Sequence, residues 1–94
     1  MAVVLTYDID RLHTAVKETL LSYGYQDSVP AVNTNNQRGI IKLPNTTLFH
    51  ENRTIKNAYL DMQKVAIQYG VLLERCIAFE LMIPVDYWGS FTAI

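Results

Sequence analysis

Two Tyr-Gly pairs, Tyr23-Gly24 and Tyr69-Gly70, stand at matching places in the two halves of this chain. Each follows a segment with the apolar spacing of an amphipathic helix, and glycine readily adopts the left-handed conformation that closes helices. The first stripe consists of Leu12, Ala15, Val16, Leu20 and Tyr23, and the second of Ile55, Ala58, Tyr59, Met62, Val65, Ala66 and Tyr69. The sequence therefore predicts two helices, one with Asp10 as its N-cap and one capped by Asn52 or Thr54.

Segments rich in β-branched, aliphatic and aromatic residues flank both predicted helices, which is the composition of strands. The near-continuous apolar run of residues 1–9 is typical of a central strand. Residues 33–39 are polar and turn-forming, so they predict a hairpin tip. Pro44 lacks the amide N–H that a central strand donates, and we expect a bulge or a change of register there. The predicted strands are residues 1–9, 27–33, 40–50 and 72–83.

The order of these elements is strand, helix, strand, repeated once. Two such units in series give the ferredoxin-like βαββαβ plait, an α+β fold in which two helices cover one face of a four-stranded antiparallel sheet. At 94 residues the chain is expected to form a single domain, residues 1–94. The open sheet face and the aromatic tail, residues 84–94, both need cover, so we expect a homodimer in which the tail contacts the partner.

Composition narrows the function classes. The chain is 50% hydrophobic and 18% charged with a net charge of −1, which excludes a disordered chain and a strong field for nucleic acid or membranes. A single cysteine, Cys76, allows no internal disulfide and is expected in the core of a cytoplasmic protein. The N-terminal apolar run is too short for a membrane span. Gly-rich phosphate loops, G-x-S-x-G and HExxH motifs are absent from the sequence.

Two carboxylates follow the first predicted strand, in the segment Tyr7-Asp8-Ile9-Asp10. Carboxylates at such a position often hold a hard cation such as Mg²⁺, but either aspartate can instead cap the following helix. One carboxylate makes no Mg²⁺ site. A two-fold axis beside this strand would bring Asp8 and its copy together into a shared site.

A polar cluster, His50, Asn52 and Arg53, stands where the second helix is predicted to begin. Free N–H groups at a helix N-terminus attract anions, so these residues are candidates for holding a phosphate. The alternative is that Asn52 or Thr54 caps the helix while the other side chains face solvent. Arg38, beside the Asn-rich loop, is a candidate contact to a nucleic-acid backbone or an ordinary solvated side chain.

The segments Val3–Ile9, Leu20–Gly24 and Ser28-Val29 resemble the opening of the small dimeric CRISPR-associated endonucleases, and of the related virulence-associated protein D ribonucleases. The resemblance implies a ferredoxin-like fold, dimerisation through the sheets with a C-terminal segment crossing to the partner, and Asp8 as the Mg²⁺ ligand with Tyr7 beside it. Pro30-Ala31 and residues 43–50 depart from the family pattern.

Two function classes follow. The first is a metal-dependent endonuclease for RNA or DNA, with Asp8 as the catalytic and Mg²⁺-binding residue. In this class Tyr7, Arg38, His50, Asn52 and Arg53 are the candidate contacts to nucleic acid or phosphate. The second is a non-catalytic dimeric module, antitoxin-like or defence-associated, that uses the open sheet and the tail for assembly or for binding a protein or nucleic acid.

Overall fold

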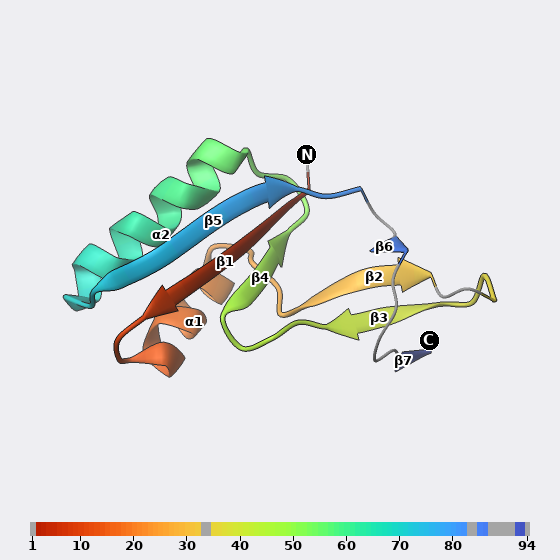
Figure 1. Cartoon of the computed structure of the whole chain (residues 1–94), viewed down its shortest axis with the longest axis horizontal. Coiled ribbons are helices and arrows are strands. Elements are labelled where there is room, and N and C mark those ends of the chain that lie inside the picture. Colours follow the sequence, from red (N-terminus) through yellow and green to blue (C-terminus); the bar gives the residue numbers. More distant parts are fainter. Residues whose placement is uncertain (1, 33–34, 83–84, 87–91, 94) are drawn as a thin grey trace.

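A computed structural model describes residues 2–32, 35–82, 85–86 and 92–93 (Figure 1). Its elements in chain order are β1 (Val3–Ile9), α1 (His13–Ser22), β2 (Ser28–Val32), β3 (Arg38–Lys42), β4 (Thr47–His50), α2 (Ile55–Tyr69), β5 (Leu73–Glu80), β6 (Val85–Asp86) and β7 (Thr92–Ala93). No helix among these residues is long and apolar enough to cross a membrane. The described residues form a mixed α+β protein with two helices and mainly antiparallel sheets, in which β2 and β6 make a short parallel pair.

The main sheet has the strand order β4-β1-β5, and both pairings are antiparallel. The central position predicted for the first strand is therefore confirmed. Strand residues alternate between faces, so Val3, Leu5 and Tyr7 face the helices while Thr6 and Asp8 lie on the opposite, open face. The helix-facing residues are at most 4% exposed, because both helices cover that side.

One apolar core joins the helices to this sheet (Figure 1). Its buried members are Val3, Leu5, Tyr7, Ile9, Val16, Leu20, Tyr25, Leu48, Ala58, Met62, Val65, Ala66 and Val71. The middle of each predicted stripe contributes to this core, so the buried face of each helix is confirmed there. Leu12, Ile55 and Tyr59, which the stripes also included, are instead exposed. Burial of this apolar surface is the main force that holds the layers together.

The helix ends follow the predictions at three of four places. Thr54 is the N-cap of α2, and its hydroxyl accepts the Asn57 N–H at 3.1 Å. Gly24 and Gly70 have φ values of 96° and 63°, the left-handed conformation expected of both Tyr-Gly closures. The prediction for Asp10 is wrong: α1 begins at His13 with Leu12 as N-cap, and no side-chain bond caps it. Asp10 Oδ1 instead accepts the distant Leu72 N–H at 2.9 Å.

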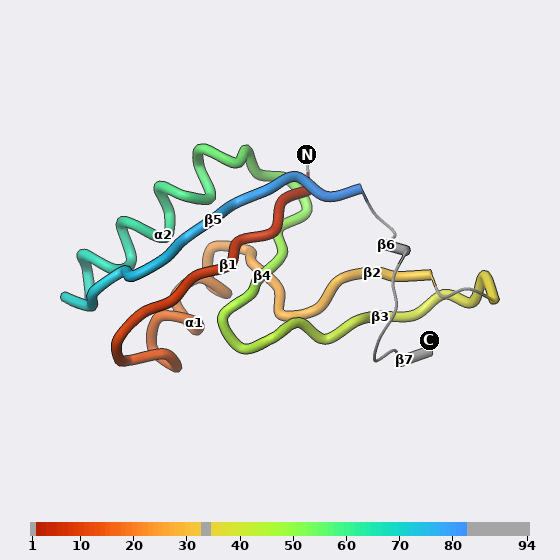
Figure 2. The backbone as a smooth tube through the Cα atoms, viewed as in Figure 1, coloured from red at the N-terminus to blue at the C-terminus, as the bar shows by residue number. Residues whose placement is uncertain are grey.

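Within the described residues the main sheet has three strands rather than the four predicted, because the predicted strand of residues 27–33 leaves it. The segment before β2 makes one bridge to β4, between Gln26 and Phe49. β2 then pairs with β3 in a second sheet of order β6-β2-β3-β7. The cause lies at Pro44, whose carbonyl accepts the Thr47 N–H at 2.9 Å in a tight turn between β3 and β4. The break expected at Pro44 is thus confirmed, and it directs the β2–β3 hairpin away from the main sheet (Figure 2).

The base of this hairpin covers one end of the open face. Val29 packs with Ala2 and the fully buried Phe49, and Ile41, Leu43 and Leu81 surround them. The described parts of the C-terminal tail lie on the same hairpin: β6 pairs with β2, and β7 with β3, within one chain. Tyr87, Trp88 and Phe91, on which the predicted contact of the tail with a partner rests, lie outside the described residues.

Candidate functional site

Asp8 stands on the open face near the end of β1, directly opposite Arg75 of β5. The Arg75 Nε donates to Asp8 Oδ2 at 2.7 Å, and Nη2 donates to the same oxygen. Neither aspartate of the segment therefore caps α1. The Asp8 side chain remains 41% exposed and that of Arg75 84% exposed, so solvent reaches the pair.

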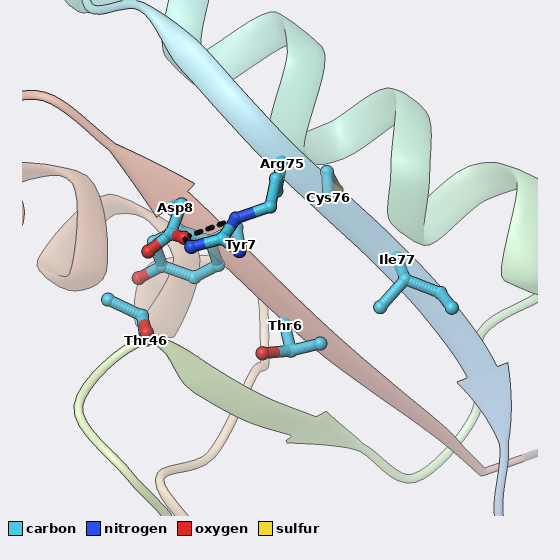
Figure 3. Close-up of a pocket in the computed structure, with 7 residues that line it drawn as sticks. All are labelled: Thr6, Tyr7, Asp8, Thr46, Arg75, Cys76 and Ile77. Atoms are coloured by element: carbon cyan, nitrogen blue, oxygen red, sulfur yellow. Dashed lines mark hydrogen bonds and ion pairs between the residues drawn. The ribbon is translucent and has the colours of Figure 1, made fainter.

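A depression of about 380 Å³ surrounds this ion pair (Figure 3). Its lining residues are Thr6, Tyr7, Asp8, Thr46, Arg75, Cys76 and Ile77. Tyr7 belongs to the helix-facing side of β1, and burial raises the pKa of its hydroxyl to about 12. Tyr7 is 4% exposed and belongs to the apolar core between the helices and the sheet.

The donor set of one chain does not fit Mg²⁺. This ion demands near-octahedral oxygen coordination, yet Arg75 already holds Asp8 Oδ2. Nowhere in the described ranges do three His, Cys, Asp or Glu side chains gather as metal ligands. Asp10 is engaged by Leu72 and lies 3.8 Å from the Arg11 Nε. A shared site built from two copies of Asp8 stays a prediction.

The cluster at the start of α2 is built into the protein rather than turned toward a ligand. Arg53 donates from Nε and Nη2 to the two carboxylate oxygens of Asp61, at 2.9 and 2.8 Å. The Tyr25 hydroxyl donates to Asp61 Oδ2 at 2.8 Å. Burial and the neighbouring Asp61 carboxylate raise the pKa of Tyr25. The anion that Arg53 binds in this structure is therefore the Asp61 carboxylate of the same chain, rather than a phosphate.

His50 is also engaged by the backbone. Its Nε2 lies 3.2 Å from the Tyr23 carbonyl oxygen, and its Nδ1 accepts the Asn52 N–H at 3.1 Å. The ring also packs edge-on against Tyr25, with centroids 5.0 Å apart. These contacts assign the Nε2–H form to the imidazole, and they tie the loop before α2 to the end of α1.

The structure does not bring the predicted site residues together. Val3 pairs with His50, and Asp8 lies five positions further along β1, which corresponds to about 17 Å. Arg38 is exposed at the start of β3, in the hairpin that extends away from the main sheet (Figure 1). Asp61 and Tyr25 were not predicted, because neither carries a local motif and their contact joins distant parts of the chain.

Sequence reasoning also missed a groove between α2 and β5, which we name the β5 groove and which is apolar in the hollow beside Ile77 and mixed in the other. Two adjoining hollows, of about 540 and 590 Å³, share Tyr59. The first is lined by Ile55, Lys56, Tyr59, Leu60, Cys76, Ile77 and Ala78, and the second by Tyr59, Gln63, Ala66, Ile67, Gly70, Val71 and Leu73. Leu60 lies outside the predicted stripe of α2 and is 46% exposed, and an apolar residue beyond the buried face is the signal that could have revealed the groove.

β5 is an edge strand of the main sheet, although the many Leu, Ile, Phe and Met residues of the predicted strand 72–83 are typical of a buried strand. In the part of the chain that the structure describes, β1 is its one strand neighbour. Ile77 is 57% exposed and Phe79 is 44% exposed on its open side. Cys76, predicted in the core, packs partly against it, and burial raises the pKa of its thiol to about 11.

A comparison with protein-family models finds no match, and comparisons with curated proteins and with solved structures find none either. Membership of the CRISPR-associated nuclease family therefore stays a prediction. The function has to be argued from the geometry of the chain itself.

Proposed function

We propose that this chain is a dimeric interaction module whose contact surface is the β5 groove together with the outer edge of β5. The observation that carries the proposal is the exposure of large apolar side chains around this edge. They are Ile55, Tyr59, Leu60, Ile67, Leu72, Ile77 and Phe79, each between 39% and 81% exposed. Apolar patches of this kind mark sites of protein association in soluble proteins.

The edge itself favours pairing. An open edge strand presents unpaired N–H and C=O groups that can add a further strand, and proteins usually protect such edges with charge, proline or bulges. In β5 the stretch from Cys76 to Phe79 contains no charge and no proline. A bulge interrupts the register only near Leu73, between Asp8 and Ile9 of the neighbouring strand. Most of β5 is therefore regular, and its outer edge can accept a further strand.

Light scattering coupled to size exclusion tests this proposal. We expect a mass twice that of the 10.7 kDa chain across the micromolar range. A monomer at all concentrations up to hundreds of micromolar, where even weak specific complexes form, would contradict it.

A second candidate is phosphodiester cleavage centred on Asp8. Its support is the placement of Asp8 at the end of the central strand, in a solvent-accessible depression beside a cation, Arg75. The order β4-β1-β5 and the Gln26–Phe49 bridge also support a ferredoxin-like ancestry for the sheet. Because one chain supplies a single carboxylate, any Mg²⁺ site requires a second copy.

Incubation with labelled RNA and DNA, in Mg²⁺ or in EDTA, tests this candidate. Asp8→Asn removes the charge but keeps the size of the side chain, so it should abolish Mg²⁺-dependent cleavage and leave the circular dichroism spectrum unchanged. Equal cleavage by the wild type and Asp8→Asn, or none by either, would eliminate phosphodiester cleavage and leave the interaction module.

A further inference from the structure

We infer that the dimer forms by antiparallel pairing of β5 with β5 of a second copy, about a two-fold axis at Ala78. This inference rests on the proposed dimer and names its partner and register. The pairing would join the two three-stranded sheets into one continuous sheet, because β5 is an edge strand of each. Such self-complementary contacts are the usual way for a homodimer to close.

Two-fold symmetry limits the choice of register. With the axis perpendicular to the sheet, residues directly opposite each other must lie on the same face, so the axis passes through a residue position. An axis at Ile77 would place Glu74 opposite the partner's Glu80, twice, and like charges in this arrangement are destabilising. An axis at Cys76 would place Arg75 opposite the partner's Ile77 on both sides of the axis, so the central open-face pairs would join a cation to an apolar side chain. An axis at Ala78 moves Arg75 outward to face Leu81, which lies beyond the end of β5.

An axis at Ala78 matches apolar residues on the open face. It places Ile77 opposite the partner's Phe79, and the same pair recurs on the other side of the axis. Both side chains are about half exposed in the single chain, so pairing would remove apolar surface from water. Aromatic side chains opposite β-branched ones are among the favourable cross-strand pairs.

The same register is complementary in charge on the helix-facing side. Lys56 lines the groove together with Cys76 and Ala78. The partner's Glu80 would stand opposite Cys76, and thus beside Lys56. Glu80 is exposed and pairs with Val3, whose side chain faces the helices, so its own side chain points to this face. Symmetry makes two such ion pairs at the two ends of the contact.

Reversing the charge of Lys56 or of Glu80, and exchanging the two charges in a double variant of the full chain, test the interface. Lys56→Glu and Glu80→Lys should each weaken the dimer by about tenfold in Kd, and the double variant should return to within about threefold of the wild type. Glu18→Lys, an exposed glutamate on α1, is the matched control and should leave Kd unchanged. Sedimentation equilibrium measures all four variants.

Cysteine pairs test the register, in a Cys76→Ala background. Ile77→Cys with Phe79→Cys in one chain should give an oxidised dimer, whereas Ile77→Cys alone should not, because residue 77 faces residue 79 of the partner. A disulfide formed by Ile77→Cys alone would overturn the Ala78 register.

The outcomes separate this inference from the proposal beneath it. A wild-type dimer that is indifferent to Lys56→Glu and Glu80→Lys would overturn the β5 pairing and leave the dimer standing. A monomeric wild type would overturn both.

Discussion

Loss of the Asp61 carboxylate should destabilise the fold, because this group accepts hydrogen bonds from two separate segments. The side chain is 13% exposed and accepts three hydrogen bonds, two from Arg53 of the loop before α2 and one from Tyr25 after α1. Asp61→Ala removes both acceptor oxygens and so all three hydrogen bonds. The network reinforces a junction that the Gln26–Phe49 bridge already makes between the segment after α1 and the end of β4, and its removal tests how much the side chains add to that bridge.

The expected cost can be worked out from the exposure of each partner. The Arg53 side chain is 35% exposed, so water can replace the carboxylate and the lost pair costs about 0.2–1 kcal/mol. Tyr25 is 2% exposed, and leaving its hydroxyl without an acceptor costs about 1–3 kcal/mol. We therefore expect Asp61→Ala to lower the free energy of unfolding by about 2–3 kcal/mol.

Urea denaturation at one fixed protein concentration measures this loss, since dimerisation would otherwise add to the stability. The control is a double-mutant cycle with Tyr25→Phe. In the Tyr25→Phe background no hydroxyl is left unsatisfied, so Asp61→Ala should cost at least about 1 kcal/mol less than in the wild type. The same cost in both backgrounds would refute the argument that the buried hydroxyl dominates.

Three further predictions concern single positions. In thermal unfolding, Gly24→Ala should destabilise the protein more than Gly70→Ala. Both glycines have a positive φ, so either alanine would cost about 1–2 kcal/mol of backbone strain. A Cβ at Gly24 would in addition lie 3.0 Å from His50 Nε2. Equal losses would contradict the steric part of this reasoning. Iodoacetamide should alkylate native Cys76 at pH 8 about 100-fold more slowly than the unfolded chain, because burial raises the thiol pKa from 9.0 to about 11. Because the folded state disfavours the thiolate, the stability that the neutral thiol contributes should be fully present below pH 9 and should be lost as the pH rises through 11. Unfolding measured at graded alkaline pH would show this loss. Thr54→Ala should cost about 1 kcal/mol through loss of the α2 N-cap, and an unchanged midpoint in urea would show that the cap bond contributes nothing.

Local physics accounts for the parts of the fold that were predictable. The helical stripes and the two Tyr-Gly closures follow from periodicity and from the conformational freedom of glycine, which act within a few residues of the chain. The interruption at Pro44 follows from a missing N–H group. Each of these features depends on neighbours in sequence, so the sequence alone determined two helices, a central first strand and a break in the third extended segment.

Tertiary structure decided where the charges found partners and which strand lay at the edge. Asp8 pairs with Arg75, Asp10 with the Leu72 N–H, and Arg53 with Asp61, and only the last two residues are near each other in sequence. A carboxylate has the same local signature whether it caps a helix, binds a metal or meets an arginine from another strand. The segment before β2 bridges β4, so the passage of β2 into a second sheet shortens the main sheet on the β4 side, whereas β5 is an edge strand because β1 is its one partner in the described residues. Strand order depends on such long-range pairing rather than on local composition.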